Sequence, residues 1–181
     1  MKVGAVFPQT EAGDDAAFIR RYVTRLEEAG CAHVVAYDHV LGHRPRDREA
    51  WERLGPYTDQ DSFHEVMTLF AYMAGCTARM GLATEVLVLP QRQTPLVAKQ
   101  AAEVAILSGG RFRLGVGLGW NPAEFSGMGM RFDDRGRRVE EQIALLRRLL
   151  AEPLVSFSGR WERVEACGIN PSPPPVPIWM G

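Results

Sequence analysis

The sequence predicts an α/β fold with a parallel sheet. Short apolar segments alternate along the chain with longer segments whose apolar residues recur at helical spacing. The apolar segments are nearly continuous, as in strands that are covered on both faces of a sheet. Strands that alternate with helices in this way build a parallel sheet. A chain of 181 residues can bury one hydrophobic core, so we expect a single domain over residues 1–181.

Two strands and one helix are expected in the first forty residues. Residues 2–7 form a short apolar run, and a helix capped by Asp14 or Asp15 follows it. Gly30 occupies a position where helices commonly end. Residues 33–37 form the next apolar run and predict the second strand.

A long polar connection, 38–61, separates the second strand from the next helix. A loop of this length within a compact domain is usually functional or mobile. Ser62 and Glu65 fit a capping box, so we expect the helix to start directly after Ser62. A third strand over 80–89 follows that helix and ends at Pro90.

The second half of the chain continues this alternation. The expected elements are a helix over 95–108, a strand over 112–116, a helix over 133–150, a β-hairpin over 154–164 and a strand over 177–180. The whole chain thus supplies five core strands, whereas a closed (β/α)8 barrel needs eight, typically over about 250 residues. The pattern leaves two alternatives, an open α/β sheet and an incomplete barrel.

The bulk composition excludes several classes of protein. The net charge is −1, which gives no electrostatic footprint for nucleic acid. No run of about 18 apolar residues could cross a membrane, and no secretory signal is visible. The cysteines Cys31, Cys76 and Cys167 form no CxxC pair. We therefore expect a cytoplasmic protein with reduced thiols and no metal site.

Asp38 and His39 directly follow the second predicted strand. Ligands of parallel α/β folds bind at the carboxyl ends of the strands. An imidazole at that place can hydrogen-bond a ligand or move a proton near neutral pH. The alternative is that Asp38 caps the loop and His39 only satisfies backbone groups.

Two carboxylates near other strand ends are further candidates. Glu85 lies inside an apolar strand, between Thr84 and Val86. Charged residues are seldom buried without a partner, so Glu85 either points into a binding site or faces solvent at an edge. Glu124 comes shortly after the fourth strand and is a second candidate carboxylate.

A glycine-rich turn, with Gly115, Gly117 and Gly119, precedes Trp120. Its spacing fails the dinucleotide-binding pattern, because Trp120 stands where the last glycine would be and no helix starts at once. The glycines would instead allow a flat ring to lie close to the backbone. Trp120 then either walls the pocket or serves packing alone.

Several segments in order along the chain resemble the luciferase-like monooxygenases and coenzyme F420-dependent oxidoreductases. They are residues 37–40, 84–90, 98–102, 107–111, 115–120, 124–125, 135–138 and 177–181. The resemblance spans essentially the whole chain. It implies a (β/α)8 TIM barrel of the luciferase-like type, of which this chain holds about the first five β/α units.

The resemblance also implies roles in the barrel mouth. Asp38 and His39 would lie beside the cofactor ring, and His39 would assist proton transfer, with Glu124 as the other catalytic candidate. Thr84, Glu85 and Val86 would form a bulge against the back of the ring. In deazaflavin-binding members this bulge often contains a non-proline cis peptide bond, which here would join Glu85 to Val86.

The glycine-rich turn and the last residue complete the implied cofactor site. Gly115, Gly117, Gly119 and Trp120 would hold the ring or its ribityl chain, and Gly181 would begin a loop that binds the cofactor phosphate. Sugar-phosphate dehydrogenases of this family carry an acid where this chain has Trp120, which disfavours a sugar-phosphate substrate. Because the phosphate loop and three further β/α units would follow Gly181, we expect a fragment of a longer protein.

The resulting functional hypothesis is an oxidoreductase that uses coenzyme F420 for hydride transfer to or from a small organic substrate. One alternative is a reduced-FMN monooxygenase on the same fold. An alternative of another class is a non-catalytic flavin-binding or truncated relative. Family members are commonly dimers, so the resemblance predicts a homodimer.

Overall fold

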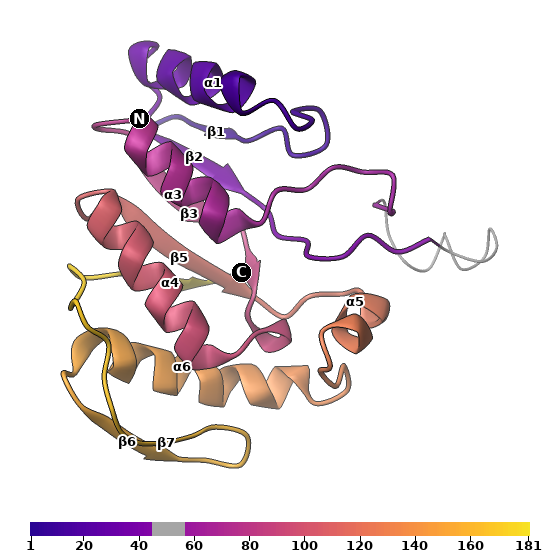
Figure 1. Cartoon of the computed structure of the whole chain (residues 1–181), viewed down its shortest axis with the longest axis vertical. Coiled ribbons are helices and arrows are strands. Elements are labelled where there is room, and N and C mark those ends of the chain that lie inside the picture. The colour runs from indigo at the N-terminus through magenta and orange to yellow at the C-terminus, as the bar shows by residue number, and fades with distance from the viewer. Residues whose placement is uncertain (45–56) are drawn as a thin grey trace.

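The computed structural model describes residues 1–44 and 57–181, so the middle of the predicted connection 38–61 lies outside the described residues. Its centre is a parallel sheet (Figure 1). The strands are β1 (Gly4–Val6), β2 (His33–Ala36), β3 (Gly81–Thr84), β4 (Leu87–Val88), β5 (Phe112–Gly117) and β8 (Ile178–Met180). They are arranged in the order β1-β2-β3-β5-β4, and β8 also pairs with β5. Each of these pairings is parallel.

Among the described residues, four long helices accompany the sheet: α1 (Ala16–Glu28), α3 (Val66–Cys76), α4 (Thr94–Leu107) and α6 (Arg135–Ala151). In Figure 1, α3 and α4 lie in front of the strands, α1 lies at the top beside β1, and α6 runs beside α4. In a doubly wound sheet the strand order reverses and helices cover both faces. Here β3 and β4 are successive pieces of one stretch of chain and both pair with β5, so the order along the sheet follows the order along the chain. With the helices along one side, this is the arrangement of a (β/α)8 barrel.

The hydrophobic core fills the space between these helices and the sheet. Phe70 of α3 meets Phe112 of β5 with ring centroids 6.0 Å apart, and both side chains are fully buried. Small residues of α4, such as Ala98 and Ala101, are also fully buried and let this helix approach the sheet closely. The core thereby fixes the strand ends from which the functional site is built.

The helix starts only partly follow the sequence prediction. Asp15 caps α1, as expected of Asp14 or Asp15. Its side-chain Oδ1 atom accepts a hydrogen bond from the Ala17 amide at 2.8 Å. The predicted helix start at Ser62 is wrong, because α3 begins after Glu65. The Glu65 carboxylate accepts a hydrogen bond from the Thr68 amide at 2.8 Å. Glu65 thus does from the N-cap position what Ser62 was expected to do.

Other differences concern short elements. The strand predicted over 80–89 is divided into β3 and β4 by a cis peptide bond between Glu85 and Val86, and a 3-10 turn, η1 (Leu89–Gln91), replaces its end. The sequence prediction missed α5 (Pro122–Gly127), although Asn121 caps it through its side chain. The hairpin is confirmed as the antiparallel pair β6 (Val155–Ser158) and β7 (Arg163–Cys167).

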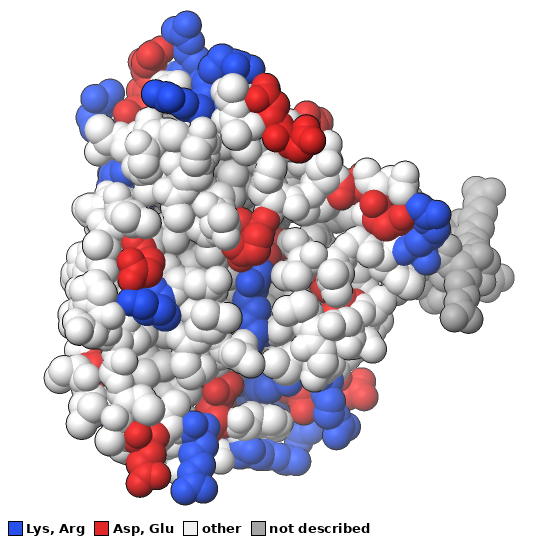
Figure 2. Space-filling view, in the orientation of Figure 1, with Lys and Arg blue, Asp and Glu red and all other residues white. Residues whose placement is uncertain are grey.

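The surface carries mixed charge. On the face shown in Figure 2, acidic and basic side chains lie close to one another at both ends of the molecule and across its middle, and neither sign dominates a large area. In the part of the chain that the structure describes, no helix is long and apolar enough to cross a membrane.

Candidate functional site

A cavity of about 300 Å³ opens where the strands of the parallel sheet end. It is lined by Tyr37, Asp38, His39, Tyr57, Glu85, Val86, Val88, Gly119, Trp120 and Glu124. Seven of these are site residues that the sequence predicted, and they come from three separate strand ends. The structure thus brings Asp38–His39, Glu85–Val86 and Gly119–Trp120 together, as the rule for parallel α/β folds requires.

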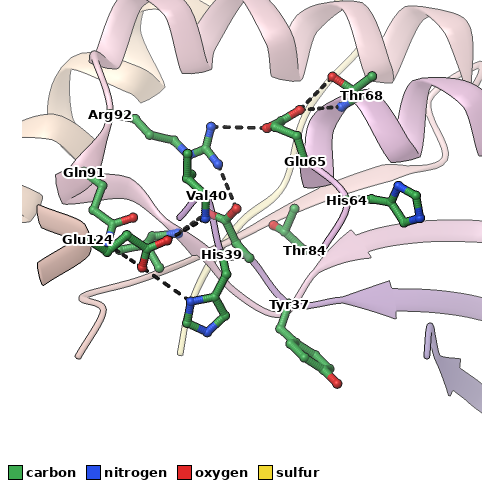
Figure 3. A network of polar contacts seen from close by, with 12 residues as sticks. Tyr37, His39, Val40, His64, Glu65, Thr68, Thr84, Gln91, Arg92 and Glu124 are labelled. Carbon is green, nitrogen blue, oxygen red and sulfur yellow. Dashed lines mark hydrogen bonds and ion pairs between the residues drawn. The ribbon is translucent and has the colours of Figure 1, made fainter. Parts of the chain in front are cut away.

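His39 lies against the carboxylate of Glu124, which belongs to the short helix α5. The His39 Nδ1 and Glu124 Oε2 atoms are 3.4 Å apart, and the His39 side chain is only 11% exposed (Figure 3). A carboxylate can only accept here, so the contact favours the tautomer in which Nδ1 carries the proton. The Nε2 atom is then left without a partner in this pair and is the atom that can act on a ligand.

Glu124 is 2% exposed and is surrounded by donors. The backbone amides of Val40 and Leu41 donate to Oε1, and the Gln91 amide nitrogen donates to Oε2 at 3.0 Å. Burial alone would raise the pKa of Glu124, but hydrogen bonds from His39, Gln91 and the two amides outweigh it and lower the pKa to about 2. Glu124 is therefore a fixed anion that positions His39 and the start of the following loop.

Asp38 is held by a second set of contacts. Its Oδ1 atom accepts from Arg92 Nη2 at 2.7 Å, and its Oδ2 atom accepts from the Val88 amide at 3.0 Å. Burial raises the pKa of Asp38, and the Arg92 guanidinium opposes this rise. Both oxygens are occupied within the chain, so the Asp38 side chain joins the end of β2 to β4.

Arg92 extends this network to α3. Its Nη1 atom lies 3.2 Å from Glu65 Oε1, and Glu65 in turn caps α3 through Thr68 (Figure 3). The Arg92 side chain is 10% exposed. The sequence prediction missed Arg92 and Gln91, because a basic and an amide residue after Pro90 give no signal of their own before the fold brings them to Asp38 and Glu124.

Aromatic rings form one wall of the cavity. The His39 ring lies edge-on to Tyr57, with centroids 5.3 Å apart, and to Trp120, with centroids 5.5 Å apart. The Phe63 ring also lies edge-on to His39, with centroids 4.8 Å apart. Tyr37 stacks on Tyr57 at 5.9 Å. Trp120 is 40% exposed, so it lines the mouth and is not a buried packing residue.

The remaining predicted site residues lie outside the lining of the cavity. A Cβ atom on Gly115 would collide with the Thr84 carbonyl, and one on Gly117 or Gly181 would collide with Val86. These glycines therefore allow the chain's own bulge to approach β5 and β8. Thr84 donates its hydroxyl to the Gly115 carbonyl at 2.6 Å. Direct contacts of Thr84, Gly115, Gly117 and Gly181 with a cofactor stay predictions.

Gly119 differs from the other glycines of this turn because it has a positive φ of 72°. L-residues with a side chain rarely adopt this conformation, so glycine is needed there to turn the chain towards Trp120. Within residues 1–44 and 57–181, no group of three or more His, Cys, Asp or Glu is arranged to hold a metal ion.

Comparison with known proteins decides the family. Residues 1–181 match the model described as luciferase-like monooxygenase. The chain belongs to this family. An uncharacterized protein of Mycobacterium tuberculosis is 32% identical over 97% of this chain and 62% of its own length. The F420-dependent glucose-6-phosphate dehydrogenase of Amycolatopsis mediterranei is 31% identical over 88% of this chain and 45% of its own length.

Solved structures share the fold. The monooxygenase RslO1 from Streptomyces bottropensis matches with a TM-score of 0.79 and 24% identity over 99% of this chain and 53% of that chain. An F420-dependent secondary alcohol dehydrogenase in complex with an F420-acetone adduct matches with a TM-score of 0.76 and 18% identity over 99% of this chain and 52% of that one. The chain thus spans about half the length of these structures. The luciferase-like α/β fold that the sequence predicted is confirmed.

Proposed function

We propose that this protein is an oxidoreductase that binds coenzyme F420 at the mouth cavity and takes part in hydride transfer to or from a small organic substrate. The observation that carries the proposal is the pair of His39 and Glu124 at the strand ends of a luciferase-like sheet. A buried carboxylate fixes the ring of His39, and the ring lines a cavity large enough for part of a ligand.

The cavity fits the ring end of such a cofactor better than the whole molecule. Ligand pockets commonly measure about 300–1,000 Å³ and are mostly apolar with a few placed polar groups. The cavity is at the lower limit of this range at about 300 Å³. Its aromatic wall and the Val86 and Val88 side chains suit a flat ring, and His39 provides the placed polar group.

The chain's own residues would have distinct roles around the bound ring. A deazaflavin supplies the hydride chemistry when it is bound. Val86 and the backbone of the bulge would support one face of the ring. His39 would hold or move a proton at Nε2, while Glu124 keeps Nδ1 protonated and the ring oriented. Trp120 would limit the access of water from the open side.

The F420-dependent relative supports this cofactor, because its similarity covers 88% of this chain. A reduced-FMN monooxygenase is the second candidate. It is supported by the similarity to RslO1 and by a match to the FMN-bound oxygenating constituent of 3,6-diketocamphane monooxygenase from Pseudomonas putida, with a TM-score of 0.69 and 18% identity over 91% of this chain and 43% of that one.

A paired titration separates the two cofactors. F420 and FMN are each added to the protein, and binding is followed by the change in cofactor absorbance and fluorescence. We expect saturable binding of F420 that is weakened by Trp120→Ala, with the exposed Trp179→Ala as the matched control. Tight FMN binding without F420 binding would overturn the proposal in favour of the monooxygenase.

A further inference from the structure

Gln9, in the turn that follows β1, is a polar residue with no exposed surface. A buried amide is stable only when its donors and its acceptor have partners. The Gln9 Nε2 atom donates to the Tyr37 carbonyl at 2.9 Å and to the His64 carbonyl at 3.2 Å. Its Oε1 atom accepts from the His64 amide at 3.1 Å. All three hydrogen bonds of this side chain therefore go to the backbone of two other segments.

These partners fix the orientation of the Gln9 amide. Carbonyl oxygens can only accept, so Nε2 must face the two carbonyls and Oε1 must face the His64 N–H. The side chain thus pairs with both backbone groups of His64, as a neighbouring strand would. The His64 ring is held as well, because its Nε2 atom lies 2.8 Å from the Gly13 carbonyl. The segment that leads into α3 is thereby tied to the turn after β1.

The two segments that Gln9 joins both lead to His39. Tyr37, whose carbonyl accepts from Gln9, lies two residues before His39. On the other side, Phe63 directly precedes His64, and its ring lies edge-on to the His39 ring with centroids 4.8 Å apart. Gln9 thus holds the backbone that carries His39 and the backbone that carries one of the rings packed against it.

We propose that Gln9 is a positioning residue that sets where the His39 ring lies in the mouth cavity. Glu124 holds this ring at its Nδ1 atom, and Gln9 holds the backbone from which the ring projects. Because Gln9 is fully buried, it acts through His39 and not on the ligand. Groups that act on a ligand need supporting residues of this kind, which lock their geometry. The inference rests on the proposed function for the view that His39 acts on the ligand, but not on which cofactor is bound.

The first test needs no cofactor. Gln9→Met nearly keeps the length of the side chain but removes its three hydrogen bonds. Two NMR measurements report on His39: the nuclear Overhauser effect between the His39 and Phe63 rings, and the ring nitrogen shifts at a pH where the ring is neutral. In the wild type we expect a strong ring contact and a proton on Nδ1. In Gln9→Met we expect a weaker contact and a mixture of the two tautomers, because the ring no longer stays aligned with Glu124.

Glu27→Met is the matched control, because it also removes hydrogen bonds to three backbone groups. The Glu27 carboxylate accepts from the amides of residues 78–80, directly before β3 and at the opposite ends of the strands from the mouth. This variant should be less stable in urea, as Gln9→Met should be, but both His39 measurements should stay as in the wild type. Gln9→Asn keeps an amide that is one methylene shorter, and it replaces Gln9→Met if that variant does not fold.

The second test adds F420 to the same proteins. We expect Gln9→Met to raise the dissociation constant about tenfold, as for a displaced positioning group, and Glu27→Met to leave it unchanged. Wild-type His39 signals or wild-type F420 affinity in the Gln9 variant, equal changes in Glu27→Met, or failure of both Gln9 variants to fold would each overturn the inference. Failure of F420 to bind the wild type would overturn the proposed function and leave the NMR test of His39 in place.

Discussion

Replacement of Glu124 by glutamine tests whether this residue is a fixed anion. The folded protein holds the pKa of Glu124 at about 2, against an ordinary value of 4.5. A difference of about 2.5 pKa units corresponds to about 3 kcal/mol of stability, at about 1.4 kcal/mol per unit. The side chain is almost fully buried, so solvent screens little of this contribution.

The sign of the pH dependence follows from the direction of the shift. Because the pKa is lower in the folded state, the contribution is complete above pH 4.5 and is lost as the pH falls towards 2. About 2 of the 3 kcal/mol should be gone by pH 3. Glu124→Gln lacks the titrating group, so the difference in unfolding free energy between the wild type and the variant should shrink over this range.

The assay is urea unfolding at a series of pH values between 3 and 7, followed by circular dichroism. Glu140→Gln on the exposed side of α6 is the matched control, because it removes an acidic group without removing a buried contact. We expect Glu124→Gln to be less stable than the wild type by up to about 3 kcal/mol at pH 7, and by much less at pH 3. A difference that stays constant from pH 7 to pH 3 would refute the assignment of Glu124 as a buried anion.

Three further predictions follow from the same site and sheet. His39→Ala should lower turnover more than about tenfold with an unchanged circular dichroism spectrum, and unchanged kinetics would reduce His39 to a structural residue. Arg92→Met should lower the unfolding free energy by about 3–5 kcal/mol, because it leaves Asp38 buried without its partner; a variant as stable as wild type in urea would contradict the pairing. Gly115→Ala should lower the melting temperature because its methyl group meets the Thr84 carbonyl, whereas Gly136→Ala, which meets nothing within 4 Å, should not; equal melting temperatures would show that the bulge adapts.

Much of the fold could be predicted because local signals and burial agree. The apolar run at 112–116 became β5, and the capping residue Asp15 begins α1, since both patterns depend only on neighbours in the sequence. The capping box at Ser62 failed because Glu65 offered the same hydrogen bond three residues later. The local sequence allowed a helix start at either Ser62 or Glu65. The ion pair of Glu65 with Arg92 exists only in the folded chain, so the sequence could not show it.

The sequence could predict which residues form the candidate site, but not which residues they contact. His39 and Glu124 could be selected because they follow strands that end at one edge of a parallel sheet. Their pairing, over 85 positions of sequence, required the turn of Gly119 and the cap of α5 at Asn121. The sequence did not predict that the two oxygens of Asp38 accept from Arg92 and the Val88 amide, and a contact of Asp38 with the cofactor stays a prediction.

The most direct test of the account is to map F420 on the labelled protein by NMR. We predict that F420 shifts the amide signals of His39, Gly119 and Trp120, which line one cavity, and leaves Glu165 in the distant hairpin unchanged. Absence of shifts at the mouth, or shifts confined to other parts of the chain, would contradict the placement of the cofactor ring beside His39.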